Sequence, residues 1–234
     1  MISSQDTTTR IRHMGPRLGI VGTVFVLLFL TGLYPVTAFG GHPFFPGPGE
    51  SLNTISAFFQ ARPSAVLLCA AFQFGAAIPL GIFTATAVSR LRFLGVRAAG
   101  SDIALFGGFA TAVTMMTASS VLWTMSYPGV AQDPTLTQAL YRLQFALGGP
   151  GFSVPFGLLI AGISVPAGFG KLLPKWIVIF GLVVAVIGEL SWLDILFPQA
   201  LLLIPLTRFP GFVWIIAAGF ALPSAREFAK VPRE

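Results

Sequence analysis

The chain has 234 residues, of which 55% are hydrophobic and only 9% are charged, and its mean hydropathy is +0.84. A water-soluble domain carries about 25% charged residues, so this composition excludes that class and predicts a protein that lies mostly in lipid. The net charge of +6 and the pI near 10.3 do not indicate a nucleic-acid partner, because the cations are spread over several short segments.

Six apolar segments follow one another along the chain, each close to the roughly 20 residues that a helix needs to cross a bilayer. They are Leu18–Phe39, Ser64–Val88, Ile103–Tyr127, Phe145–Phe169, Trp176–Leu193 and Leu201–Leu222. They lack the alternation of a membrane β-barrel, and a helix satisfies its own backbone hydrogen bonds in lipid. We therefore predict an all-α membrane protein, a six-helix transmembrane bundle over residues 18–222, with tails at residues 1–17 and 223–234.

Lysine and arginine residues are distributed unevenly between the two sides of these segments. Eleven of the fourteen lie on the side of the two termini: Arg10, Arg12, Arg17, Arg90, Arg92, Arg97, Lys171, Lys175, Arg226, Lys230 and Arg233. The opposite side holds Arg62, Arg142 and Arg208. Because cytoplasmic loops are enriched in Lys and Arg, we predict cytoplasmic termini and a multi-pass protein of the cell membrane, which in a bacterium is the inner membrane.

The first outer loop, Gly40–Pro63, is the longest connection between the segments. It opens with glycines and prolines that are incompatible with a helix. A helical face follows, formed by Leu52, Ile55, Phe58 and Phe59, with Ser51 or Glu50 at its start. We predict a short helix that lies flat on the outer membrane interface. A lid over an outward-facing cavity is the alternative.

Small residues recur at intervals of four in the second and third segments. The two runs are Ala77, Gly81 and Ala85, and Ala104, Gly108 and Ala112. Each run places small side chains on one stripe of a helix, which lets two backbones approach closely. We predict that these stripes pack segment two against segment three, and a homodimer interface is the alternative.

Prolines divide the later segments. In the fourth segment Gly-Phe-Ser-Val-Pro-Phe-Gly recurs as Gly-Ile-Ser-Val-Pro-Ala-Gly after eleven residues, close to three helical turns. We predict helix kinks at Pro155 and Pro166, and the alternative is a groove that faces a ligand. Pro205 and Pro210 flank Arg208, so we predict that the sixth segment is broken there.

Glu189 and Arg208 are ionisable residues inside predicted spans, where such residues are rare and face the bundle interior. Counting from the inner helix ends places both roughly 20 Å above the inner boundary, so we predict an ion pair between them. The same count places Gln73, Ser153, Thr117 and Thr31 at this level. The layer is either a structural pair with interhelical hydrogen bonds, or a polar cavity open to the outer side. In the cavity, Arg208 would anchor an anion or a lipid headgroup.

Cofactor and catalytic motifs are missing from the sequence. His13 and His42 lie outside the spans, which argues against a haem held by two histidines in the bundle. With Cys69 as the single cysteine and no paired histidines, the sequence also argues against a Cys/His zinc site. There is no phosphate loop or dinucleotide fingerprint. We therefore predict no cofactor, no metal and no catalytic residue, and we lean toward a protein that is not an enzyme.

Two functions remain in view. The first is a non-enzymatic integral membrane protein, an accessory or interaction subunit of a membrane assembly, with protein subunits or a second copy as partners besides the lipid bilayer. The alternative is a binder or transporter of a small polar or anionic molecule, or of a lipid, through the layer around Glu189 and Arg208. An intramembrane enzyme would need a reactive residue beyond this pair.

Overall fold

The computed structural model describes residues 9–228. Within them, six helical spans are long and apolar enough to cross a membrane: Leu18–Val36, Pro63–Phe93, Gly100–Met125, Pro134–Phe169, Lys175–Ile195 and Pro198–Ala221. The prediction of an all-α protein with six helices able to cross a membrane is confirmed. One small addition is a two-stranded antiparallel sheet, in which β1 (Thr9–Arg12) of the N-terminal tail pairs with β2 (Ala225–Phe228) of the C-terminal tail.

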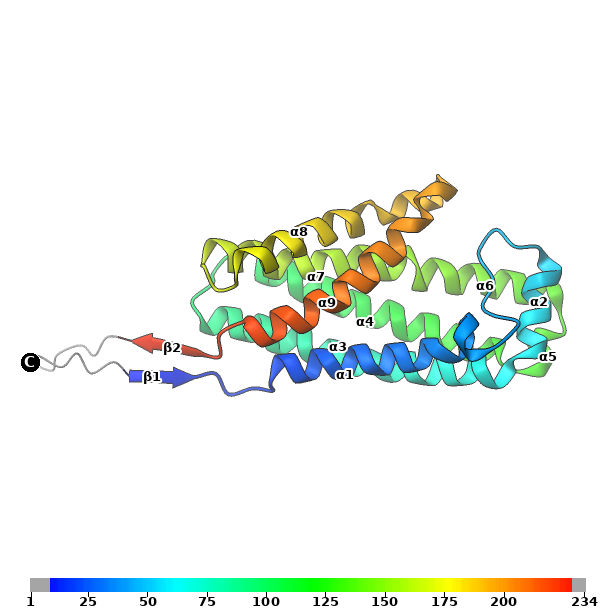
Figure 1. Cartoon of the computed structure of the whole chain (residues 1–234), viewed down its shortest axis with the longest axis horizontal. Coiled ribbons are helices and arrows are strands. Elements are labelled where there is room, and N and C mark those ends of the chain that lie inside the picture. The colour runs from blue at the N-terminus through cyan, green and yellow to red at the C-terminus, as the bar shows by residue number, and fades with distance from the viewer. Residues whose placement is uncertain (1–8, 229–234) are drawn as a thin grey trace, which may run out of the picture.

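The bundle is built from helices of unequal length. Its main body consists of α1 (Leu18–Leu33), α3 (Pro63–Phe93), α4 (Gly100–Met125), α6 (Pro134–Gly148) and α7 (Pro150–Phe169). A hairpin of α8 (Lys175–Leu190) and α9 (Leu203–Ala221) packs on one side, and α9 crosses from α8 to α1 (Figure 1). The 3-10 turns η3 (Ser191–Ile195) and η4 (Pro198–Leu202) join the two hairpin helices.

Helices α3 and α6 extend beyond the hairpin at one end of the bundle (Figure 1). At 31 residues, α3 is roughly 46 Å long, which exceeds the roughly 30 Å hydrocarbon core of a bilayer. We call this the outer end, following the orientation predicted from the charges, and the opposite end the inner end. The N-terminal half of α6 therefore stands above the level reached by the α8–α9 hairpin.

The outer end carries a small apolar core of its own. The 3-10 turns η1 (Tyr34–Val36) and η2 (Ala38–Gly40), α2 (Leu52–Ala61) and α5 (Pro128–Ala131) cover the ends of α3, α4 and α6 there. The predicted helix is present as α2, and Ser51 caps it by accepting a hydrogen bond from the Thr54 N–H at 3.2 Å. Its apolar face is not turned toward lipid: Ile55, Phe58 and Phe59 are buried against protein. The predicted helix is therefore present, but its apolar face packs on protein and not on the membrane surface, which corrects that part of the prediction.

The α6–α7 span is interrupted near its middle. The predicted fourth segment began at Phe145, but α6 starts at Pro134, where Asp133 accepts hydrogen bonds from the backbone N–H groups of Thr135 and Leu136. α6 ends at Gly148 and α7 begins at Pro150. Proline is favoured at the first position of a helix because its missing N–H would have no partner there. The two helices remain nearly end to end (Figure 1).

Glycines allow the central helices to approach closely. A Cβ added to Gly162 of α7 would lie 2.5 Å from the backbone nitrogen of Ala104, and one added to Gly107 would lie 2.5 Å from the Pro155 carbonyl oxygen. Gly108 lies against the Thr84 side chain of α3. α4 is therefore packed between α3 and α7, with glycine at both contacts.

The two predicted stripes are divided among several environments. Ala77, Ala104 and Ala112 are buried, Gly81 is half-buried, and Ala85 is exposed. Gly108 contacts α3, whereas Ala104 lies against Gly162 of α7. The stripes therefore do not run along one continuous seam between α3 and α4.

The sixth span is not broken at Arg208. α9 is a continuous helix from Leu203 to Ala221, and the irregular backbone lies before it, in η3 and η4. Pro205 falls in the first turn of α9, where backbone N–H groups lack helical partners, so it can be accommodated. Pro155 and Pro166 of α7 and Pro210 of α9 also lie inside continuous helices, and kinks at these positions remain predictions.

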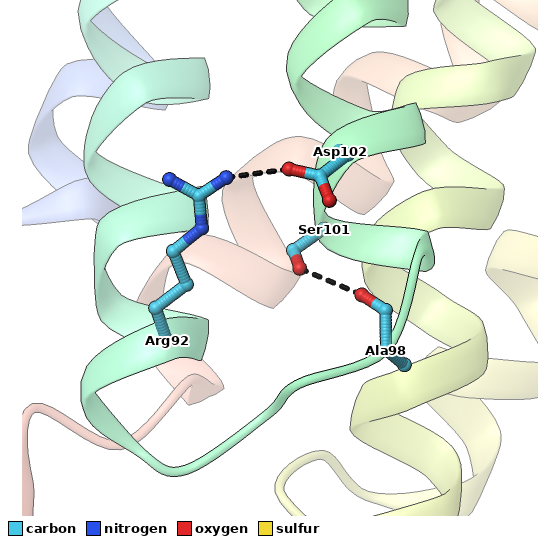
Figure 2. A network of polar contacts seen from close by, with 4 residues as sticks. All are labelled: Arg92, Ala98, Ser101 and Asp102. Carbon is cyan, nitrogen blue, oxygen red and sulfur yellow. Dashed lines mark hydrogen bonds and ion pairs between the residues drawn. The ribbon is translucent and has the colours of Figure 1, made fainter.

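Two arginine residues of α3, Arg90 and Arg92, form polar contacts between segments at the inner end of the bundle. Arg90 is buried, and it donates hydrogen bonds to the carbonyl oxygens of Leu222 at 3.3 Å and Pro16 at 3.1 Å, joining both ends of the bundle sequence to α3. Figure 2 shows the turn between α3 and α4, where Arg92 forms an exposed 2.5 Å ion pair with Asp102. Ser101 donates to the Ala98 carbonyl oxygen at 2.9 Å in the same turn.

Candidate ligand cavity

A cavity of about 380 Å³ lies in the outer half of the bundle, where α1, α3, α4, α6, α7 and α9 surround it. Most of its wall is apolar, with aromatic side chains such as Phe29, Phe145 and Phe152. Three larger polar side chains reach it from different helices, namely Gln73 of α3, Gln144 of α6 and Arg208 of α9. An apolar pocket with a few convergent polar groups is the usual form of a small-molecule site.

Arg208 is held at this cavity by aromatic rings and one backbone carbonyl. Its guanidinium carbon lies 4.9 Å from the centre of the Phe152 ring and 5.5 Å from that of Phe29. Its Nη2 donates a hydrogen bond to the carbonyl oxygen of Gly148, while its buried Nε has no partner. The negative faces of aromatic rings attract a cation, so the site stabilises the positive charge without a carboxylate.

The break between α6 and α7 supplies the carbonyl group that Arg208 uses. In an unbroken helix, the Gly148 oxygen would accept from the N–H of Phe152, four residues later. Here the Phe152 N–H donates instead to the Gly149 oxygen at 3.2 Å. The carbonyls of the last helical turn lack partners within the helix, and Arg208 satisfies one of them.

The predicted ion pair between Glu189 and Arg208 is wrong. Glu189 lies at the contact of α8 with α7, where a Cβ added to Gly157 would be 3.0 Å from its Oε1. This oxygen is buried and has no hydrogen-bond partner. Within the described part of the chain, neither residue forms an ion pair. Counting residues gives depth along a helix, but the 100° rotation per residue decides the neighbour. Glu189 faces Gly157 of α7, whereas Arg208 lies by Gly148 at the end of α6 and by the rings of Phe29 and Phe152.

The other members of the predicted layer are also separated. Gln73 lines the cavity with Arg208. Ser153 is fully buried on the α7–α8 side, next to Gly188, and its hydroxyl has no partner. Thr31 and Thr117 are exposed, and Thr117 donates to its own helix at the Val113 carbonyl oxygen, 2.8 Å away. Two of the six expected residues thus lie together in the cavity.

Gln144 is the residue that the sequence did not single out. Its Oε1 is buried without a hydrogen-bond partner, and its side chain lines the cavity. The fourth segment predicted from the sequence begins at Phe145, and Gln144 lies just outside it. The adjoining Gly148-Gly149-Pro150 was a usable signal, because glycine followed by proline marks a helix end with free carbonyls.

The first outer loop forms the roof of the cavity. Phe44, Phe45 and Pro46 line it, and α2 lies behind them. The Tyr141 hydroxyl donates to the Pro46 carbonyl oxygen at 2.7 Å, and the ring of Phe45 packs 5.4 Å from that of Phe58. The segment before α2, rather than α2 itself, therefore occupies the place expected of a lid.

Arg62 anchors the start of this loop. Its Nη2 donates to the carbonyl oxygens of Pro35 and Gly40, each at 2.9 Å, and its Nη1 donates to that of His42 at 3.3 Å. Gly41 adopts a φ of +118°, a backbone conformation that residues other than glycine rarely adopt, and it packs beside the Arg62 guanidinium. The roof is thus tied to the top of α3.

The histidines lie at opposite ends of the molecule. The ring of His42 packs on Phe44 at 5.4 Å. His13 lies at the inner end, with its Nε2 at 3.0 Å from the Ser89 hydroxyl, and burial together with the charge of Arg90 lowers its pKa below the ordinary value of 6.5. Over the residues that the structure covers, no three His, Cys, Asp or Glu side chains gather as metal ligands.

Comparisons of the chain with protein-family models, with curated protein sequences and with solved structures gave no match.

Proposed function

We propose that this integral membrane protein binds a small anionic molecule in the outer half of the bilayer, with Arg208 as the anion-binding group. The observation that carries the proposal is a guanidinium at a cavity with no acidic partner. A guanidinium has five N–H donors, and Arg208 uses one nitrogen for the Gly148 carbonyl. Ionisable residues inside membrane spans are costly to bury and mark binding sites or pathways.

Gln73 and Gln144 complete the site. Both are neutral amides that donate and accept hydrogen bonds, so they can orient a ligand without cancelling the charge of Arg208. They reach the cavity from α3 and α6, whereas Arg208 reaches it from α9. A ligand held by all three would link the α8–α9 hairpin to α3 and α6. Such a site serves a binding protein, and in a transporter it would be the substrate site.

The first test is native mass spectrometry of the protein after gentle extraction from its own membrane. We expect a bound small anion on the wild-type chain and on Arg142→Ala, which removes an exposed outer arginine away from the cavity. Arg208→Ala should lose the ligand. If that variant does not fold, Arg208→Lys and Gln144→Leu replace it. Retention of the ligand on all folded cavity variants contradicts the proposal.

An accessory subunit is the second candidate. A groove of about 370 Å³ lies between α3 and α4 on the side of the bundle. The small residues Ala71 and Ser120 are exposed in it, and Phe74 and Trp123 also line it. Small residues allow a partner helix to approach closely. Ala71→Leu should then remove a stoichiometric partner chain in the same spectra. A complex that survives this change excludes the groove as the interface.

We also propose that the basic end faces the cytoplasm. The described cations Arg12, Arg17, Arg97 and Lys175 are exposed at or beside the inner end. A fluorescent protein fused after residue 234 should fold and fluoresce, whereas alkaline phosphatase fused there should be inactive. The reverse pattern would invert the membrane orientation without changing the cavity.

A further inference from the structure

We infer that the occupant of the Arg208 cavity is a small monocarboxylic acid with an apolar body, inserted with its carboxylate first, and not the headgroup of a membrane phospholipid. The inference rests on the proposed anion site and specifies its ligand.

Gln73 and Arg208 lie toward the floor of the cavity. α3 runs inward from the outer end, so Gln73 is about 6 Å deeper than Cys69. α9 also runs inward, and Arg208 is about 6 Å deeper than Ile204, which lines the same cavity. The guanidinium is thus at the lower end of the space, beside Phe29 and Phe152.

The upper walls and the roof are mainly apolar. Val36, Leu122 and Ile204 line the upper wall, and the roof consists of Phe44, Phe45 and Pro46. Phe45 is held there by Phe58 and Tyr141, and its backbone N–H donates to the Val36 carbonyl oxygen at 2.8 Å. A ligand that fills this space places its acidic group inward and its apolar body toward the outer end.

This polarity is opposite to that of a lipid in the outer leaflet. A phospholipid keeps its charged headgroup at the surface and its chains toward the bilayer centre, so its head would meet the aromatic roof and its chains would meet Arg208. A free acid has no such constraint. The volume of about 380 Å³ is near the lower end of the roughly 300–1,000 Å³ found for small-molecule sites. It suits a small acid better than a two-chain lipid.

The charge of the site indicates a single negative charge on the ligand. Among the described residues that line the cavity, Arg208 alone is charged. A carboxylate matches the planar guanidinium, and it accepts hydrogen bonds from the amide N–H groups of Gln73 or Gln144 as well. A second negative charge would be buried without a partner, which is strongly unfavourable.

The test compares two ligands with the same body. 4-Phenylbutyrate and 4-phenylbutanol are titrated by calorimetry into the protein in nanodiscs of phosphatidylcholine. We expect the acid to bind at least tenfold more tightly than the alcohol, and Arg208→Ala or Arg208→Lys to reduce this preference. Phe45→Ala should weaken both ligands by a similar factor, because it removes part of the roof. Arg142→Ala should change neither.

Nanodiscs that contain phosphatidylglycerol distinguish the two anion sources. We expect this lipid not to displace the acid. If the lipid binds in an Arg208-dependent manner and the acid binds no better than the alcohol, the carboxylic-acid inference is overturned while the anion site stands. If neither the acid nor the lipid depends on Arg208, both the inference and the proposed function fail.

Discussion

The guanidinium of Arg208 lies over the ring of Phe152 at 4.9 Å, and it is bonded to the carbonyl group that the break before α7 leaves free. Both features come from residues 148–152, on either side of the helix break. A cation at this depth is therefore balanced by π-electrons and a backbone dipole, which leaves its charge available to a ligand.

The first prediction concerns energetic independence of Glu189 and Arg208. Because the two side chains have different contact residues and form no ion pair, a double-mutant cycle with Glu189→Gln and Arg208→Lys should give a coupling free energy below about 0.5 kcal/mol. Unfolding in mild detergent by a denaturant series measures it. A coupling above about 1 kcal/mol, with the double variant more stable than either single one, would restore the ion pair.

A second prediction concerns glycine packing. Gly162→Ala should destabilise the bundle by about 1–3 kcal/mol, because the new methyl group meets the backbone of Ala104 and Gly100 in α4. Gly75→Ala is the matched control, since it lies in α3 with open space around its Cβ position, and it should be neutral or stabilising by up to about 1 kcal/mol. Thermal unfolding compares them. Equal effects would argue against tight α4–α7 packing.

Cys69 offers a direct report of occupancy. It is the single cysteine of the chain and lines the cavity above Gln73, so no other thiol interferes. We predict that 4-phenylbutyrate slows its alkylation by N-ethylmaleimide at least threefold in folded protein, as followed by mass spectrometry. Protection should disappear in Arg208→Ala. Protection that persists in that variant would place the acid elsewhere.

The inner end should respond to pH through His13. Burial and the charge of Arg90 lower the pKa of this imidazole below 6.5, so folding favours its neutral form. The stabilisation is complete above the unfolded value and is lost as the pH falls through the folded pKa. An NMR titration of the His13 ring in the His42→Gln variant should give a pKa below 6.5. A value at or above 6.5 would show that His13 does not dock beside Arg90 as described.

The number of membrane helices could be predicted from the sequence because it depends on the length and hydropathy of consecutive segments. Apolar length predicted six spans, and loop patterning predicted the helix after Ser51. Contacts between helices were harder. Depth alone grouped Thr31 and Thr117 with Arg208, yet both are exposed because their helices turn them outward. The partner of Arg208 is a backbone carbonyl: Gly148-Gly149-Pro150 indicates the helix end that leaves it free, but it does not indicate which side chain contacts it.

The carbonyl group that Arg208 binds lies at the helix break before Pro150. Pro150 cannot donate an N–H group, and it begins a new helix at the point where α6 stops. If Pro150→Ala allowed α6 and α7 to form one continuous helix, the Gly148 oxygen would accept a hydrogen bond from the Phe152 N–H. The guanidinium of Arg208 would then lose its backbone partner. The position of a charged group in α9 thus depends on a helix break between α6 and α7. Evolutionary selection for ligand binding therefore extends to Pro150, a residue whose side chain has no polar group.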